Sequence, residues 1–168
     1  MGGAEYMKSI KKYETIINEA LRSALEYDTP EGQINEFISF FGKHIGSDRI
    51  YIFEDDEEHH VTNNTYEWCT EGITPQIEHL QGVNMEVIDW WYDTFEEGKS
   101  VIISDVEELK GVHQVSYNML KYQNVHKVVV SPLRHKGQIR GFFGVDNPPA
   151  VDYNALTMFL DMIGTMLI

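Results

Sequence analysis

The chain has 168 residues, enough for one domain with a sizeable hydrophobic core. Its formal charge of −14 repels phosphate backbones and anionic headgroups, so we expect neither nucleic acid nor a membrane as a partner. The single cysteine cannot form an internal disulfide, no apolar run is long enough to span a membrane, and the first residues lack the apolar core of a secretory signal. These features predict a cytoplasmic protein.

Hydrophobic periodicity predicts two helices at the start of the chain, followed by a β-hairpin. Apolar residues at helical spacing favour a helix over about residues 8–27, and Thr29-Pro30 is typical of the cap and first turn of a second helix. Residues rich in β-formers predict a strand over 48–53 and a return strand over 60–68. The four acidic residues at 55–58 repel one another, so we expect them on a solvated hairpin turn.

The second half of the chain predicts three further strands and several helices. We expect helices over 85–97 and 116–123, a helical turn over 105–111, and a final helix over about 152–168. The expected strands cover 101–103, 127–133 and 139–145. Several strands are apolar on both faces, which predicts helices on both sides of the sheet. The element order therefore favours an α+β fold, a three-layer sandwich with a central antiparallel sheet of about 5–6 strands.

Three stretches of the sequence, together with this element order, resemble the GAF domain, a sensory fold related to PAS. The stretches are SDRIYIFEDD at 47–56, EVIDWWYDTFEEGKSVIISDVEEL at 86–109 and VHKVVVSPLRHKGQIRGFFGVDNP at 125–148. In the last one, the apolar strand, the Pro-Leu pair, the turn glycine and the pattern G-x-x-G-V-D form a recurrent GAF signature. The resemblance implies a single GAF domain over 1–168, a fragment of a longer protein. It is also similar to bacterial GAF modules that lie upstream of GGDEF diguanylate cyclase domains.

Candidate catalytic and metal-binding residues are few. Cys69 has the acidic neighbours Glu67 and Glu71, which raise the pKa of a thiol and disfavour a nucleophilic role. GAF-type free methionine sulfoxide reductases use several cysteines, and bilin-binding GAF domains usually carry a Cys-His pair; this chain has neither feature. The seven histidines show no H-x-x-x-H spacing. We therefore expect no catalytic residue, no metal and no cofactor.

Aromatic residues concentrate in the part of the chain that would form the ligand pocket of a GAF domain. A pocket with an aromatic wall and a few polar groups suits a small planar or apolar ligand. The expected lining residues are Tyr51, Trp68, Trp90, Trp91, Tyr117, Ser131 and Phe143. The alternative, with equal weight, is that these residues simply fill the core. The motif of cyclic-nucleotide GAF domains is absent.

The resemblance implies a sensory, non-catalytic module of a bacterial signal-transduction protein, such as a diguanylate cyclase or a histidine kinase. Its expected partners are an unidentified small molecule, a second copy bound through the terminal helices (about 8–27 and 152–168), and a downstream output domain in the same chain. Two alternatives remain open. One is an enzyme of the free methionine sulfoxide reductase kind, disfavoured by the single cysteine. The other is a ligand-free structural domain used only for dimerisation.

Overall fold

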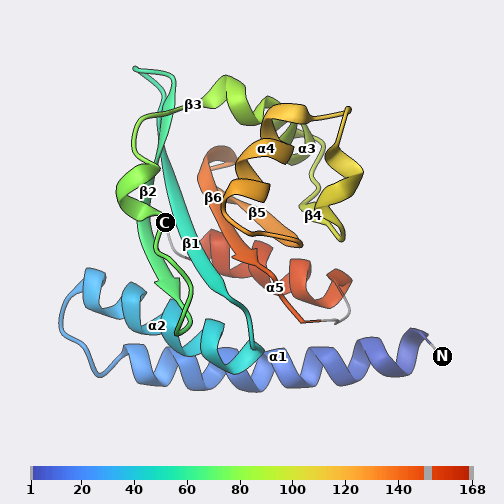
Figure 1. Cartoon of the computed structure of the whole chain (residues 1–168). Helices are drawn as coiled ribbons and strands as arrows, with labels where there is room; N and C mark the ends of the chain where they lie inside the picture. Colours follow the sequence, from blue (N-terminus) through green and yellow to red (C-terminus); the bar gives the residue numbers. More distant parts are fainter. Residues whose placement is uncertain (1, 150–152, 167–168) are drawn as a thin grey trace.

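Helices on both faces enclose a six-stranded antiparallel sheet in the computed structural model, which describes residues 2–149 and 153–166 (Figure 1). The strands lie in the order β3-β2-β1-β6-β5-β4. Their bounds are β1 (Arg49–Asp56), β2 (Val61–Cys69), β3 (Val83–Asn84), β4 (Val101–Ile103), β5 (Val128–His135) and β6 (Gln138–Asp146). This architecture confirms the predicted α+β sandwich and its antiparallel sheet.

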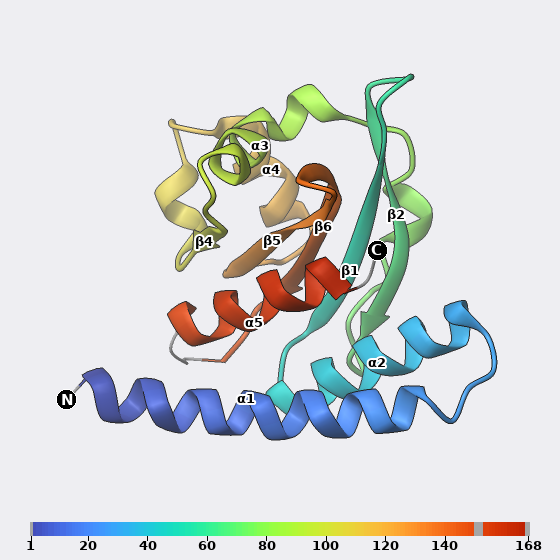
Figure 2. The ribbon, with the colours of Figure 1, turned by 180° about the vertical axis from the view of Figure 1, so that it is seen from behind.

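One face of the sheet is covered by α2 (Pro30–Ile45) and α5 (Tyr153–Met166), and α1 (Gly2–Ala24) packs outside both of them (Figures 1 and 2). The Thr29 side chain caps α2 by accepting a hydrogen bond from the Gly32 N–H, as the sequence predicts. We expected α1 to begin near residue 8, but it begins at Gly2. Residues 152 and 167–168 of the expected final helix lie outside the described residues.

The opposite face is covered by shorter elements. They are α3 (Asp89–Glu96), α4 (Gln114–Tyr122) and the 3-10 helices η1 (Ile77–His79), η2 (Met85–Ile88) and η3 (Val106–Leu109). The single helix expected over 85–97 is therefore two elements, because its first turn is a 3-10 turn that Asn84 caps through the Glu86 N–H. In the described part of the chain, none of the helices combines the length and the apolar composition that a membrane crossing requires.

The hairpin between β1 and β2 differs from the sequence prediction. Asp55 and Asp56 are the last residues of β1, so the turn covers only 57–60. Asp55 does not face bulk solvent, because its carboxylate accepts a 2.6 Å hydrogen bond from the Tyr92 hydroxyl of α3. His59 lies in this turn, with its Nδ1 2.7 Å from an Asp56 carboxylate oxygen.

Successive side chains of the central strand β1 point alternately toward the two helical layers. Ile50 and Ile52 of β1 belong to the core beneath α2 and α5, whereas Tyr51 and Phe53 belong to the core beneath α3 and α4. This alternation follows from the two-residue period of a strand. Because β1 pairs antiparallel with β6, the first residue of β1 lies opposite the last residue of β6.

Candidate functional site

A small cavity of about 40 Å³ lies between the sheet and the layer that contains α3 and α4. A buried water needs about 10–15 Å³ of such space, so the cavity has room for a few atoms of ligand or a few waters. Its apolar wall consists of Tyr51, Phe53, Leu80, Val83, Ile88, Trp91, Met119, Leu120 and Phe142. Its polar lining consists of Arg49, Asn64, Glu67, Gln123 and Asp146.

The aromatic rings of the wall pack around Phe142. Its ring stacks on Phe53 with a centroid distance of 4.6 Å, and Trp91 meets it edge-on at 5.4 Å. The indole Nε1 of Trp91 is buried and has no hydrogen-bond partner among the described residues. A residue of this apolar wall therefore carries an N–H donor that makes no hydrogen bond in the described structure.

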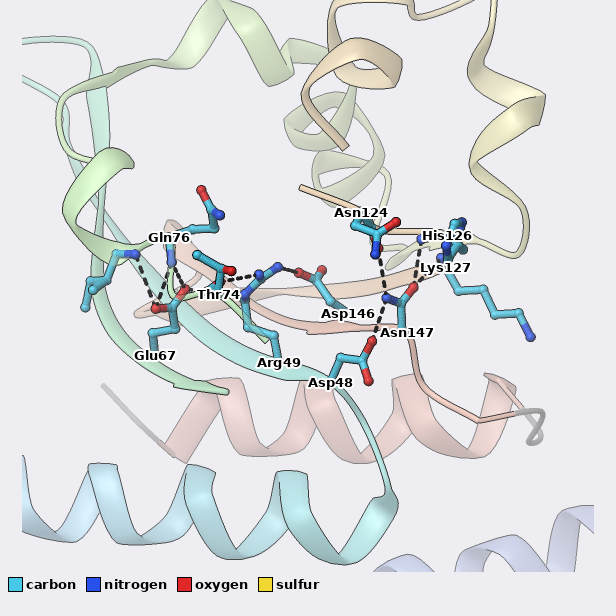
Figure 3. Close-up of polar contacts among 11 residues, drawn as sticks. Asp48, Arg49, Glu67, Thr74, Gln76, Asn124, His126, Lys127, Asp146 and Asn147 are labelled. Carbon is cyan, nitrogen blue, oxygen red and sulfur yellow. Dashed lines mark hydrogen bonds and ion pairs between the residues drawn. The ribbon is translucent and has the colours of Figure 1, made fainter. Parts of the chain in front are cut away.

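A buried cluster of charged groups forms the polar end of the cavity (Figure 3). Arg49 Nη1 donates a 2.6 Å hydrogen bond to Asp146 Oδ2, and Arg49 Nε lies 3.5 Å from Glu67 Oε2. The three side chains are only 2–4% exposed. The other carboxylate oxygen, Asp146 Oδ1, is buried without a hydrogen-bond partner in the described part of the chain.

Arg49 and Glu67 also fix the segment that connects β2 to β3. Arg49 Nη2 donates a 2.8 Å hydrogen bond to the Thr74 carbonyl oxygen, and the Glu67 carboxylate accepts from the backbone N–H groups of Gln76 and Ile77 (Figure 3). This segment carries η1 and Leu80, and Leu80 lines the cavity. The charged cluster therefore holds one wall of the cavity against the sheet.

Burial dominates the ionisation of the groups at this end. It raises the pKa of Asp146 to about 6, although the guanidinium of Arg49 acts in the opposite direction. Burial, together with the neighbouring Asp146 carboxylate, also holds the pKa of the Tyr51 phenol well above its usual range. At neutral pH the site therefore contains a neutral phenol and a carboxylate that is costly to keep ionised.

Asn147 connects the ends of three segments beside the cavity. Its Oδ1 accepts from the backbone N–H groups of His126 and Lys127, and its Nδ2 donates a 2.9 Å hydrogen bond to Asp48 Oδ2 (Figure 3). A polar surface hollow of about 390 Å³ lies next to this network and shares Arg49 and Gln123 with the cavity. The polar end of the cavity therefore lies next to the protein surface.

The structure brings two of the seven expected pocket residues, Tyr51 and Trp91, to the cavity. Trp68, Ser131 and Phe143 lie on the other face of the sheet. Trp68 pairs with Ile50 in the β1–β2 ladder, and Ser131 pairs with Phe143 in the β5–β6 ladder. Because directly paired residues share a face, these three residues face α2 and α5.

The remaining two expected residues, Trp90 and Tyr117, lie outside the cavity lining. Trp90 is about 100° around the helix from Trp91, stacks on His113 at 4.2 Å and donates a hydrogen bond to Ser116. The Tyr117 hydroxyl donates a 3.0 Å hydrogen bond to an exposed Glu107 oxygen. Both side chains pack around the start of α4.

Sequence reasoning missed the charged pair Arg49 and Asp146. A signal for it exists in the sequence, since Arg49 opens one apolar strand and Asp146 closes another. If the two strands pair antiparallel, these opposite charges must lie side by side, as they do in the β1–β6 ladder. The missing information was which strand pairs with which.

Cys69 lies beside this cluster but does not line the cavity. Burial and the Glu67 carboxylate raise the pKa of its thiol, although Arg49 acts in the opposite direction. The thiol is therefore protonated at neutral pH and poorly nucleophilic. Within residues 2–149 and 153–166, no three His, Cys, Asp or Glu side chains gather as they would around a metal ion.

Comparison with known proteins identifies the fold through solved structures and not through sequence families. No family model matches the sequence, and no curated protein matches it significantly. Solved structures do match: a phycocyanobilin-bound GAF domain from a cyanobacterial phytochrome is 17% identical with a TM-score of 0.71, over 92% of this chain and 93% of that one. The chain has the GAF fold.

Two further solved structures show how diverse the proteins with this fold are. The GAF domain of a phosphoenolpyruvate-protein phosphotransferase from Coxiella burnetii is 11% identical, with a TM-score of 0.71 over 94% of this chain and 91% of that one. A free methionine-R-sulfoxide reductase from Neisseria meningitidis, in complex with its substrate, is also 11% identical, with a TM-score of 0.67 over 94% and 87%. At these identities the likeness concerns the GAF fold, and function must be argued from the site.

Proposed function

We propose that this chain is a sensory and dimerisation module that binds a small molecule in the cavity. Binding changes the packing of the terminal helices α1 and α5, and an output domain of the same bacterial protein, such as a diguanylate cyclase or a histidine kinase, responds. A GAF domain of the same fold that holds a bilin supports the ligand-binding part of this proposal. The output domain rests on the sequence resemblance to GAF modules upstream of diguanylate cyclases.

The observation that carries the ligand-binding proposal is a set of three buried polar atoms, around a largely apolar cavity, that make no hydrogen bond in the described structure. Trp91 Nε1, Asp146 Oδ1 and Arg49 Nε are buried and make no hydrogen bond within the described residues, and all three side chains line the cavity. Arg49 Nε has the Glu67 carboxylate as its ion-pair partner at 3.5 Å. Buried polar atoms are rarely left unpaired, because their lost contact with water is then uncompensated. A molecule that enters the cavity and reaches these atoms would supply the missing partners.

Native mass spectrometry of the purified protein tests this proposal. We expect a co-purifying small molecule on the wild type and its loss from Val83→Phe, which fills the cavity from its wall. Val115→Phe is the matched control, because Val115 is 61% exposed and lies outside the cavity lining. Absence of any bound mass, together with a Val83→Phe variant that is simply more stable, would favour the ligand-free structural domain.

Exposed apolar side chains on the terminal helices support dimerisation. Met7 of α1 and Met158 and Met162 of α5 are 54%, 43% and 45% exposed. The two helices lie side by side here, since the Tyr6 hydroxyl contacts the Met158 sulfur at 3.6 Å. A separate apolar groove of about 440 Å³ lies between α1, α2 and α5, and the 75% exposed Leu25 is among its lining residues. A second copy would remove these apolar side chains from water.

Light scattering tests the dimer. We expect the mass of two chains for the wild type and of one chain for Met162→Glu, which places a charge in the contact. Val115→Glu, on the opposite helical layer, is the control and should leave the mass unchanged. A substitution further along α1, such as Ile17→Glu, would not test the dimer, because Ile17 is only 4% exposed and a buried glutamate there would unfold the domain. A wild type with the mass of one chain would refute the dimer.

The reductase alternative is disfavoured by the site. The only cysteine of the sequence, Cys69, does not line the cavity, and burial raises the pKa of its thiol. A turnover assay with free methionine sulfoxide should give no product above background. Product formation that is abolished by Cys69→Ser would establish the enzyme and overturn the non-catalytic module.

A further inference from the structure

The polar end of the cavity holds more negative than positive charge. One guanidinium, that of Arg49, faces two carboxylates, those of Asp146 and Glu67. Of the described residues that line the cavity, Arg49 alone is positively charged. Buried charges require compensation, and this cluster carries one negative charge more than its single guanidinium neutralises.

The unmet charge can be assigned to one atom. Both Glu67 oxygens accept hydrogen bonds from backbone N–H groups, and Asp146 Oδ2 accepts from Arg49. Asp146 Oδ1 accepts no hydrogen bond in residues 2–149 and 153–166, and the neighbouring Tyr51 phenol carries no positive charge that could balance this carboxylate. A donor that carries positive charge fits beside Oδ1 better than a neutral one, because charge-assisted hydrogen bonds are the stronger ones.

The rest of the cavity adds two further constraints on an occupant. The rings of Phe53, Trp91 and Phe142 line it, so the carbon chain of an organic cation can pack against apolar surface there. Trp91 Nε1 is an unpartnered donor in the described structure, so it requires an acceptor atom such as a neutral oxygen. A carboxylate in that place would add negative charge to a cluster that already has an excess of it.

We infer that the cavity binds a small organic cation that also carries a neutral oxygen, with an amino alcohol as the simplest example. Its ammonium group donates to Asp146 Oδ1, its oxygen accepts from Trp91 Nε1, and its short carbon chain lies against Phe142. The volume of about 40 Å³ limits the part that enters without movement of the walls to a few heavy atoms. This inference rests on the proposed ligand-binding function and specifies the chemistry of its ligand.

Three probe molecules of nearly equal size test separately whether binding requires the positive charge and whether it requires the oxygen. Ethanolamine has both groups, propylamine has the ammonium group but no oxygen, and 1,2-ethanediol has the oxygen but no charge. The readout is the indole N–H signal of Trp91 in the nitrogen–proton NMR spectrum of labelled protein, assigned with Trp91→Phe. The Trp90 signal is an internal control, because its N–H already donates to Ser116 outside the cavity.

We expect ethanolamine to move the Trp91 signal saturably and to bind about tenfold or more tightly than either isostere, while the Trp90 signal stays in place. Asp146→Asn should remove the preference for the cation over the diol. If that variant does not fold, Glu67→Gln lowers the same excess charge and should weaken ethanolamine binding, whereas the exposed Glu71→Gln should not.

The outcomes separate this inference from the proposed function. Equal binding of the diol and ethanolamine overturns the cation and leaves the ligand-binding module intact. No response to any probe, with a co-purified molecule on the wild type, overturns the ligand class alone. No response to any probe and no co-purified molecule overturn both, and the cavity then holds water.

Discussion

Replacing Asp146 by asparagine tests the electrostatics of the cavity directly. Burial raises the pKa of this carboxyl group from its ordinary 3.8 to about 6 in the folded protein, against the attraction of Arg49. The folded chain therefore binds a proton more tightly at this position than the unfolded chain does. Protonated Asp146 stabilises the fold, and this contribution is lost as the pH rises from about 4 through about 6.

The size of the effect follows from the shift in pKa. One pKa unit corresponds to about 1.4 kcal/mol, so ionisation of Asp146 lowers the free energy of unfolding by about 3 kcal/mol when complete. Asparagine is neutral at every pH and close in shape to the protonated acid. The unfolding free energy of the wild type relative to Asp146→Asn should therefore fall by about 2 kcal/mol between pH 4 and pH 7, since a small part of the loss occurs below pH 4.

Urea unfolding followed by tryptophan fluorescence measures this difference at a series of pH values. The exposed Asp93→Asn is the matched control for the removal of one surface carboxylate. Only the change with pH is diagnostic, because a steric difference between the two side chains is the same at every pH. A relative stability of the wild type that rises with pH would mean that the attraction of Arg49 outweighs burial, and the reasoning would be refuted.

Two further substitutions test the packing around the cavity. Gly141→Ala should lower the free energy of unfolding by at least about 2 kcal/mol in thermal unfolding, because Gly141 has a φ of 152° and a Cβ would collide with a carbonyl oxygen of β1. The control, Gly137→Ala in an open turn, should lower it by only about 1 kcal/mol. Equal losses for the two variants would contradict the collision. Tyr92→Phe should lower the free energy of unfolding by about 1–3 kcal/mol, because it removes the 2.6 Å hydrogen bond to Asp55. Tyr122→Phe, at an 87% exposed position, is the control and should not change this free energy measurably in chemical unfolding. If Tyr92→Phe is as stable as the wild type, the hydrogen bond adds no net stability.

Local signals in the sequence were sufficient for most of the elements. Thr29 and Gly46 mark the ends of α2 by chemistry that acts within a few residues, namely a side-chain cap and a left-handed backbone. β3 could not be predicted in the same way, because it has only two residues and exists through its pairing with β2. The acidic end of the hairpin was misplaced because the contact between Tyr92 and Asp55 spans 37 residues.

The lining of the cavity was harder to predict than the elements around it. A strand that is apolar on both faces has no polar alternation, so the sequence does not reveal whether Tyr51 or Ile50 faces α3 and α4. Trp68 and Phe143 were assigned to the cavity by aromatic character, yet strand parity places them on the opposite face. The charged end needs still more information, since Arg49 meets Asp146 only when β1 is known to pair with β6.

The pairing of β1 with β6 at the centre of the sheet also sets the order in which the molecule can assemble. The β1–β2 and β5–β6 pairs are hairpins with short turns, whereas Arg49 and Asp146 are 97 residues apart in the chain. Closing so long a loop is entropically costly, so we expect this junction to form after the two hairpins. The polar end of the cavity is built across that junction and is absent until both hairpins have docked. An occupant of the cavity would therefore hold the two halves of the sheet together and would bind only the completed fold.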